Sequence, residues 1–120
     1  MTEAAFDEIL RRLVAEFVVI GGLALGAKGV IRATKDIDIV VSRDTKNLKV
    51  VAEVAMAAGG DVQGLDGVPS FEELHSRASD AEVLGVNVAV CSVEDLRAMK
   101  RAAGRGQDLV DLENLDATES

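Results

Sequence analysis

Residues 16–41 read EFVVIGGLALGAKGVIRATKDIDIVV, and this stretch decides the fold. The apolar run 17–20 is short and β-branched, which is typical of a buried strand. The glycine pair Gly21–Gly22 closes that run, and segment 23–29 predicts a short helix. A second β-branched run over 36–41 predicts another strand. The stretch therefore predicts a strand, a turn, a helix and a second strand in direct succession.

The rest of the chain continues this alternation of helix and strand signals. Periodic apolar residues, N-cap residues and β-branched runs predict helices over 6–14, 45–58, 93–103 and 107–115, a short helix opened by the Ser70 capping box, and strands over 61–65 and 83–90. This order predicts an α/β (α+β) fold with a small mixed sheet flanked by helices. We expect a single domain over residues 1–120, with the polar residues 116–120 frayed.

Composition excludes several classes of function. The chain has 120 residues and a formal net charge of −8, which argues against a non-specific nucleic-acid binder. It contains no apolar run of 18 residues, and its N-terminal segment is acidic rather than signal-like, so we expect a cytoplasmic protein with no membrane segment. The single cysteine, Cys91, lies in an apolar run and is expected to be a buried thiol.

Two acids, Asp36 and Asp38, interrupt the second strand of the opening stretch. Side chains alternate between faces along a strand, so both carboxylates point the same way, about 7 Å apart. Unpaired and half-buried, they would repel each other. A divalent cation such as Mg²⁺ or Mn²⁺ removes that repulsion, because hard cations prefer oxygen ligands. Two other arrangements remain open: both acids face water, or they pair with Arg32 or Lys35.

The glycine pair adds a second chemical feature. A strand that runs through Gly21 and Gly22 into a helix lets backbone N–H groups approach a phosphate, although a plain tight turn has the same sequence. A phosphate-accepting turn followed by an acid pair on the next strand indicates chemistry on a metal-bound polyphosphate.

These motifs resemble a known family. The segments IGG (20–22) and RATKDIDIV (32–40) are similar to the signature of the DNA polymerase β-like nucleotidyltransferase superfamily. The Arg-x-Thr lead-in to the acid pair, Arg32 and Thr34, resembles that of the small bacterial branch, which includes minimal nucleotidyltransferases and AbiEii-type toxins. The segment 94–115 is similar to the end of such proteins, with Lys100, Arg105 and Asp108 in a K-x4-R-x2-D spacing. The resemblance covers residues 5–115.

The resemblance implies a metal-dependent transfer of a nucleoside monophosphate. The substrate would be an NTP with Mg²⁺ or Mn²⁺, and the acceptor a hydroxyl of RNA, of a protein or of a small molecule. Gly21–Gly22, Arg32 and Thr34 would bind the nucleotide. Lys100 and Arg105 would hold the site together or contact the triphosphate.

A third carboxylate on a neighbouring strand completes the metal site in that superfamily. Asp61 is our choice for this carboxylate, because it begins the segment before the short helix. Relatives usually place an acid on a strand in that segment. Asp66, in the loop that follows, and Asn87, within the predicted strand 83–90, are the alternatives.

The chain is short for this superfamily, because no helical lobe follows the core to hold a nucleobase and an acceptor. We therefore expect a homodimer or a small partner protein to supply those surfaces. The alternative function is a binding or regulatory protein with weak or absent catalysis that keeps the nucleotidyltransferase fold, as one half of a toxin–antitoxin-like pair.

Overall fold

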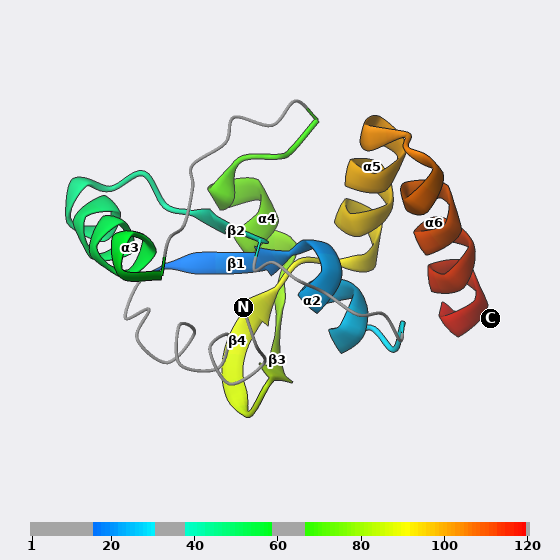
Figure 1. Ribbon diagram of the computed structural model, residues 1–120, viewed down its shortest axis with the longest axis horizontal. Helices are drawn as coiled ribbons and strands as arrows, with labels where there is room; N and C mark the ends of the chain where they lie inside the picture. The colour runs from blue at the N-terminus through cyan, green and yellow to red at the C-terminus, as the bar shows by residue number, and fades with distance from the viewer. Residues whose placement is uncertain (1–15, 31–37, 59–66, 120) are drawn as a thin grey trace.

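The computed structural model describes residues 16–30, 38–58 and 67–119 (Figure 1). The described elements are β1 (Phe17–Ile20), α2 (Gly21–Ala27), β2 (Asp38–Val41), α3 (Thr45–Ala58), α4 (Phe71–Arg77), β3 (Ser79–Val83), β4 (Val86–Val90), α5 (Val93–Ala103) and α6 (Gly106–Glu119). This is the mixed α/β arrangement that the sequence predicts.

The described strands form one sheet in the order β2-β1-β4-β3. β1 pairs antiparallel with β2 and parallel with β4, and β3 pairs antiparallel with β4. The sheet is therefore mixed, as predicted. Its most buried strand is β1, where Val18 and Val19 have no exposed surface. A strand with neighbours on both sides and helices over its faces must be apolar throughout, and FVVI is.

Helices cover this central strand. α2 and α4 both contact β1, and α5 and α6 lie side by side as an antiparallel pair beyond the end of β1 (Figure 1). Each of these four helices contributes at least one nearly inaccessible leucine to the core: Leu25 from α2, Leu74 from α4, Leu96 from α5 and Leu115 from α6. The end of β1 that leads into α2 therefore lies close to the α5–α6 pair.

The predicted helix starts are confirmed where side chains cap them. The Ser70 hydroxyl accepts a hydrogen bond from the Glu73 N–H, and the Ser92 hydroxyl accepts one from the Asp95 N–H. Asp44 accepts one from the Asn47 N–H at the start of α3. Each bond satisfies a backbone donor that the first helical turn leaves without a partner.

The prediction of one strand over 83–90 is wrong, because this segment contains the turn of a hairpin. β3 and β4 flank the two residues Leu84 and Gly85, whose φ angles are +52° and +80°. Two successive positive φ angles are typical of the tight turn that joins antiparallel strands. Leucine rarely adopts a positive φ and β3 is polar, so neither a turn nor a strand was visible in the sequence.

Two helix ends also differ from prediction. α2 begins at Gly21 rather than after the glycine pair. α6 continues to Glu119, so residues 116–119 are helical rather than frayed. The end of α6 is held by the buried Leu115 and by an ion pair between Arg97 and Asp116, whose nitrogen and oxygen are 2.7 Å apart. Contacts with α5 thus stabilise a polar segment that would fray in isolation.

Two predicted elements lie outside the described residues: the helix over 6–14 and the strand over 61–65. Among the described helices, none combines the length and the apolar character needed to cross a bilayer.

Cys91 is fully buried, as the sequence predicts. Burial raises the pKa of its thiol to about 12. Because the thiolate is the reactive form, we expect thiol reagents to label Cys91 at least about tenfold more slowly in native buffer than in denaturant. A stopped-flow assay with an aromatic disulfide reagent measures both rates. Equally fast labelling in the two conditions would contradict this packing.

Candidate active site

The first part of the site lies where β1 ends and β2 begins. Ile20 pairs with Asp38 across the two strands, so the next residue, Gly21, lies beside the Asp38 side chain. Gly21 has a φ of +67°, and a Cβ atom placed on it would be 2.6 Å from Asp38 Oδ2. Only glycine combines this backbone conformation with that close approach. The glycine thus makes the space that the carboxylate occupies.

Asp38 places an exposed carboxylate at this end of the sheet. The other predicted metal ligands, Asp36 and Asp61, lie outside the described residues, as do Asp66, Arg32 and Thr34. Within the described ranges there is no cluster of three or more side chains of the kinds that hold a metal ion.

Asn87, the third alternative for the missing ligand, lies away from this end of the sheet. Val90 of β4 pairs with Val19 of β1, and Asn87 comes three residues earlier on β4. At about 3.3 Å per residue along the strand, Asn87 lies roughly 10 Å further than Val90 from the end of the sheet that holds Asp38. It also lies near the hairpin turn, opposite Glu82. The Asn87 alternative is therefore wrong on geometric grounds.

The second part of the site is the turn between α5 and α6. α5 ends at Ala103, and its C-cap residue, Gly104, adopts a left-handed conformation with a φ of +62°. The next residue, Arg105, precedes the first turn of α6, and Asp108 Oδ2 accepts a hydrogen bond from the Arg105 backbone N–H at 3.1 Å. This is the return half of a capping box, with an aspartate in place of the usual glutamate. The local sequence therefore places Arg105 and Asp108 together.

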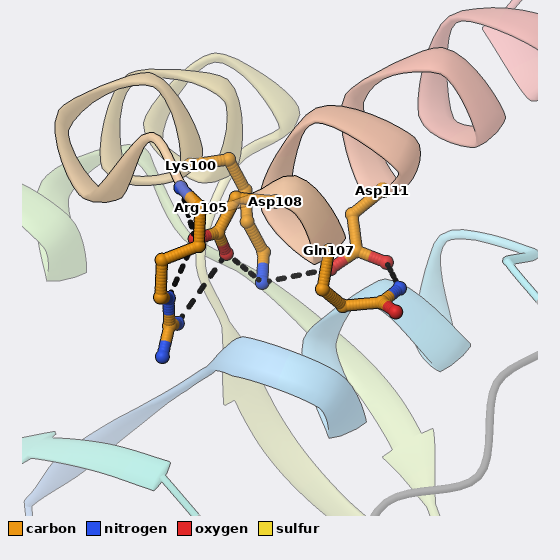
Figure 2. A network of polar contacts seen from close by, with 5 residues as sticks. All are labelled: Lys100, Arg105, Gln107, Asp108 and Asp111. Carbon is orange, nitrogen blue, oxygen red and sulfur yellow. Dashed lines mark hydrogen bonds and ion pairs between the residues drawn. The ribbon is translucent and has the colours of Figure 1, made fainter.

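A buried ion cluster joins the two helices (Figure 2). Lys100 Nζ on α5 lies 3.2 Å from Asp108 Oδ1 and 3.0 Å from Asp111 Oδ2 on α6. The Lys100 side chain is 11% exposed and both carboxylates are 1% exposed. Asp111 also accepts a hydrogen bond from the Gln107 side-chain amide at 3.0 Å. Buried carboxylates need such partners, because an uncompensated charge in the interior is costly.

Arg105 is the outward-facing member of the cluster. Its Nε donates to Asp108 Oδ2 at 2.8 Å and its Nη2 donates to Asp108 Oδ1 at 3.4 Å, yet its side chain is 77% exposed. Figure 2 shows the guanidinium extending from the α5–α6 turn toward the junction of β1 and α2. The Asp108 hydrogen bond raises the pKa of Arg105, and the charges of Asp111 and Asp38 add to the effect. Arg105 therefore lies within electrostatic range of Asp38.

Asp108 is held in its ionised form. The hydrogen bond from Arg105 lowers the pKa of this carboxyl to about 2, and the Lys100 ammonium acts in the same direction, whereas burial opposes both. Asp108 is therefore a fixed negative charge at neutral pH and cannot exchange a proton with a substrate there.

The structure thus places Gly21 beside Asp38, joins Lys100 and Arg105 through Asp108, and brings Arg105 within electrostatic range of Asp38. Sequence reasoning missed Asp111. Its signal was its spacing: Asp108 and Asp111 are three residues apart on a helix and share one face. Acids on one helix face opposite a predicted basic helix indicate an ion cluster.

Comparison with known proteins supplies the family. No curated protein and no solved structure matches the chain. Residues 3–119 match the model of a family described as "Nucleotidyltransferase of unknown function (DUF6036)". The match spans both halves of the site, from the glycine turn to α6. The chain therefore belongs to this family of nucleotidyltransferases.

Proposed function

We propose that this protein is a metal-dependent nucleotidyltransferase that transfers a nucleoside monophosphate from an NTP to an acceptor hydroxyl. The observation that carries the proposal is that the Asp38 carboxylate and the Arg105 guanidinium lie within electrostatic range of each other at one end of the sheet. Asp38 lies against Gly21, and Arg105 extends toward the same place from the α5–α6 turn. An oxygen ligand for a cation and a donor for phosphate oxygens are what a metal-bound triphosphate requires.

The one proposed ligand that the structure describes, Asp38, is of the kind that Mg²⁺ or Mn²⁺ prefers. Asp38 presents a hard carboxylate, and the missing Cβ of Gly21 leaves room for that carboxylate beside the backbone. We propose that Asp36, Asp38 and Asp61 hold the ion. The chemistry that such an ion supplies is neutralisation of charge on the attacking and leaving oxygens.

The protein's own groups would bind and orient the reactants. Arg105 would contact the triphosphate through the N–H groups beyond those that Asp108 engages, and the glycine turn would admit the phosphates close to the backbone. The acceptor oxygen then forms a bond to the α-phosphorus, and the bond from that phosphorus to the α,β-bridging oxygen breaks. Pyrophosphate leaves with that oxygen, and the acceptor's proton passes to solvent.

The acceptor class of the proposal is a hydroxyl of RNA, of a protein or of a small molecule. We further propose that a second copy of the chain or a small partner protein completes the surface for the nucleobase and the acceptor, in the manner of the AbiEii-type branch.

Substitution of Asp38 tests the proposed function. Isothermal titration with each of the four ribonucleoside triphosphates in Mg²⁺ should show binding to the unmodified protein. Asp38→Ala should weaken that binding by at least about tenfold, because it removes a charged oxygen ligand. Asp36→Ala and Asp61→Asn should have the same effect.

Asp80→Ala is the matched control, because Asp80 is an exposed aspartate on the edge strand β3. It should leave binding unchanged. If no NTP binds in Mg²⁺, or if Asp38→Ala and Asp80→Ala behave alike, the proposed function is wrong. If Asp61→Asn alone has no effect, only the choice of the third ligand is wrong.

A further inference from the structure

We infer that Asp108 is a positioning residue that holds Arg105 toward the Asp38 end of the sheet, with Lys100 as its internal counter-ion rather than a contact to the triphosphate. This inference rests on the proposed function and assigns different tasks to the two cations. The resemblance alone left two roles open for both Lys100 and Arg105.

Exposure separates the two cations. The Lys100 side chain is 11% exposed and the Arg105 side chain is 77% exposed. A lysine ammonium has three donors, and Asp108 and Asp111 take two of them within 3.2 Å. Lys100 is thus committed to the interior, and a phosphate would have to displace a buried carboxylate to reach it.

Arg105 keeps most of its donor capacity. A guanidinium has five N–H donors in a planar fork, and Asp108 engages the Nε donor and one at Nη2. The other donors lie on the exposed part of the fork. A guanidinium held by one carboxylate on one edge can still bind phosphate oxygens on the other edge. Arg105 therefore suits the phosphate-binding task.

Asp108 fixes the direction of that fork. Both Asp108 oxygens accept hydrogen bonds from the Arg105 side chain, and Oδ2 also accepts one from the Arg105 backbone N–H. Holding a long side chain in one orientation before the ligand arrives removes an entropic cost from binding. Asp108 itself is 1% exposed and negatively charged, so it is unsuited to contact a triphosphate. Its effect on binding must pass through Arg105.

A double-substitution cycle tests this dependence, with inorganic triphosphate in Mg²⁺ as the probe. Arg105→Ala and Asp108→Asn should each weaken binding by roughly 10- to 100-fold, the range for one charge-assisted hydrogen bond. Adding Asp108→Asn to Arg105→Ala should weaken binding by less than about twofold more, because the group it positions is gone. Asp108→Glu should restore part of the loss.

Lys100→Met in the Arg105→Ala background tests the counter-ion role. Residual binding should stay within about twofold, because the proposed effect of Lys100 also passes through Arg105. All titrations are done at a temperature where circular dichroism shows each variant to be folded. Arg97→Ala is the matched control, because Arg97 forms an ion pair with Asp116 that joins the same two helices. It should leave binding unchanged.

A measurement without any ligand separates this inference from the proposed function. In a ¹H–¹⁵N spectrum, the Arg105 Nε–H should be shifted and slow to exchange in the unmodified protein, and should resemble a solvated arginine in Asp108→Asn. If triphosphate binds and Asp38→Ala abolishes that binding while the Arg105 and Asp108 effects multiply, this inference alone is overturned. A further loss on Lys100→Met would likewise overturn the counter-ion role. If nothing binds triphosphate, the proposed function and this inference both fail, even with the Nε–H signal as expected.

Discussion

Replacing Lys100 with Met is expected to lower the free energy of unfolding by about 3–5 kcal/mol at neutral pH. Methionine keeps the length of the side chain but leaves Asp108 and Asp111, each 1% exposed, without the ammonium between them. Replacing a whole buried ion cluster by apolar residues often changes stability little. Removing only one partner is strongly destabilising, because the opposite charge stays in the interior. Urea unfolding monitored by circular dichroism measures the loss.

The loss should shrink in acid. The pKa of Asp108 is lowered to about 2 in the folded protein, against about 3.9 in an unfolded chain. A depressed folded pKa contributes stability that is fully present above the unfolded value and disappears as the pH falls through the folded value. Without the Lys100 ammonium, the pKa of Asp108 should be lowered less in the folded protein. The gap between the two proteins should therefore narrow as the pH falls from about 4 toward 2.

Two further variants isolate the buried charge as the cause. Arg97→Met removes a cation from the α5–α6 ion pair whose carboxylate, on Asp116, is 64% exposed, and it should cost no more than about 1 kcal/mol. Adding Asp111→Asn to Lys100→Met should recover part of the loss, because one of the two buried carboxylates that faced the ammonium is then neutral. If Lys100→Met costs no more than Arg97→Met, the buried cluster does not stabilise the fold.

Gly21→Ala should lower stability by about 1–3 kcal/mol from backbone strain alone, because Gly21 has a φ of +67°. The new methyl group would also lie 2.6 Å from Asp38 Oδ2 and 3.2 Å from Asp38 Cβ, so the carboxylate must move. We therefore expect Gly21→Ala to weaken Mg²⁺-dependent NTP binding as strongly as Asp38→Ala does. Thermal unfolding and isothermal titration measure the two effects.

Gly26→Ala provides the matched control within the same helix. A Cβ at Gly26 has no neighbour within 4 Å. Alanine in a helix interior is favoured over glycine by roughly 0.5–1 kcal/mol, so this variant should be equally or more stable. In an Asp38→Ala background, Gly21→Ala should cost less than in the unmodified protein, because Oδ2 and Cγ are gone. Equal costs in both backgrounds would show that the contact with Asp38 does not matter.

Local sequence signals were enough to predict many elements. The run FVVI, the serines that cap α4 and α5, and the helix that starts at Thr45 all form as expected. These signals involve neighbours within about four residues, so they act in any fold. The placement of Gly21 beside Asp38 was not among these predictions, because it depends on the antiparallel pairing of β1 with β2 across the intervening α2.

Contacts between distant residues decided the rest. The sequence of Ser79–Val90 carries no clear signal for a hairpin, because leucine rarely occupies a turn position with a positive φ. Leu84 has that conformation in the turn between the paired strands β3 and β4. The parallel pairing of β1 with β4 joins segments separated by α2, β2, α3, α4 and β3. α6 continues past Leu115 because α5 holds it there.

The same distinction applies to the site. Residue type and position on a strand identified Asp38 as a candidate metal ligand, and the resemblance to the superfamily implied roles for Lys100 and Arg105. Which cation faces inward could not be read from the chain. That depends on the packing of α5 against α6, which buries Lys100 between Asp108 and Asp111 and leaves Arg105 exposed. Lys100 is the inward-facing cation because the two buried carboxylates need a partner in the interior. That requirement exists only once the chain has folded.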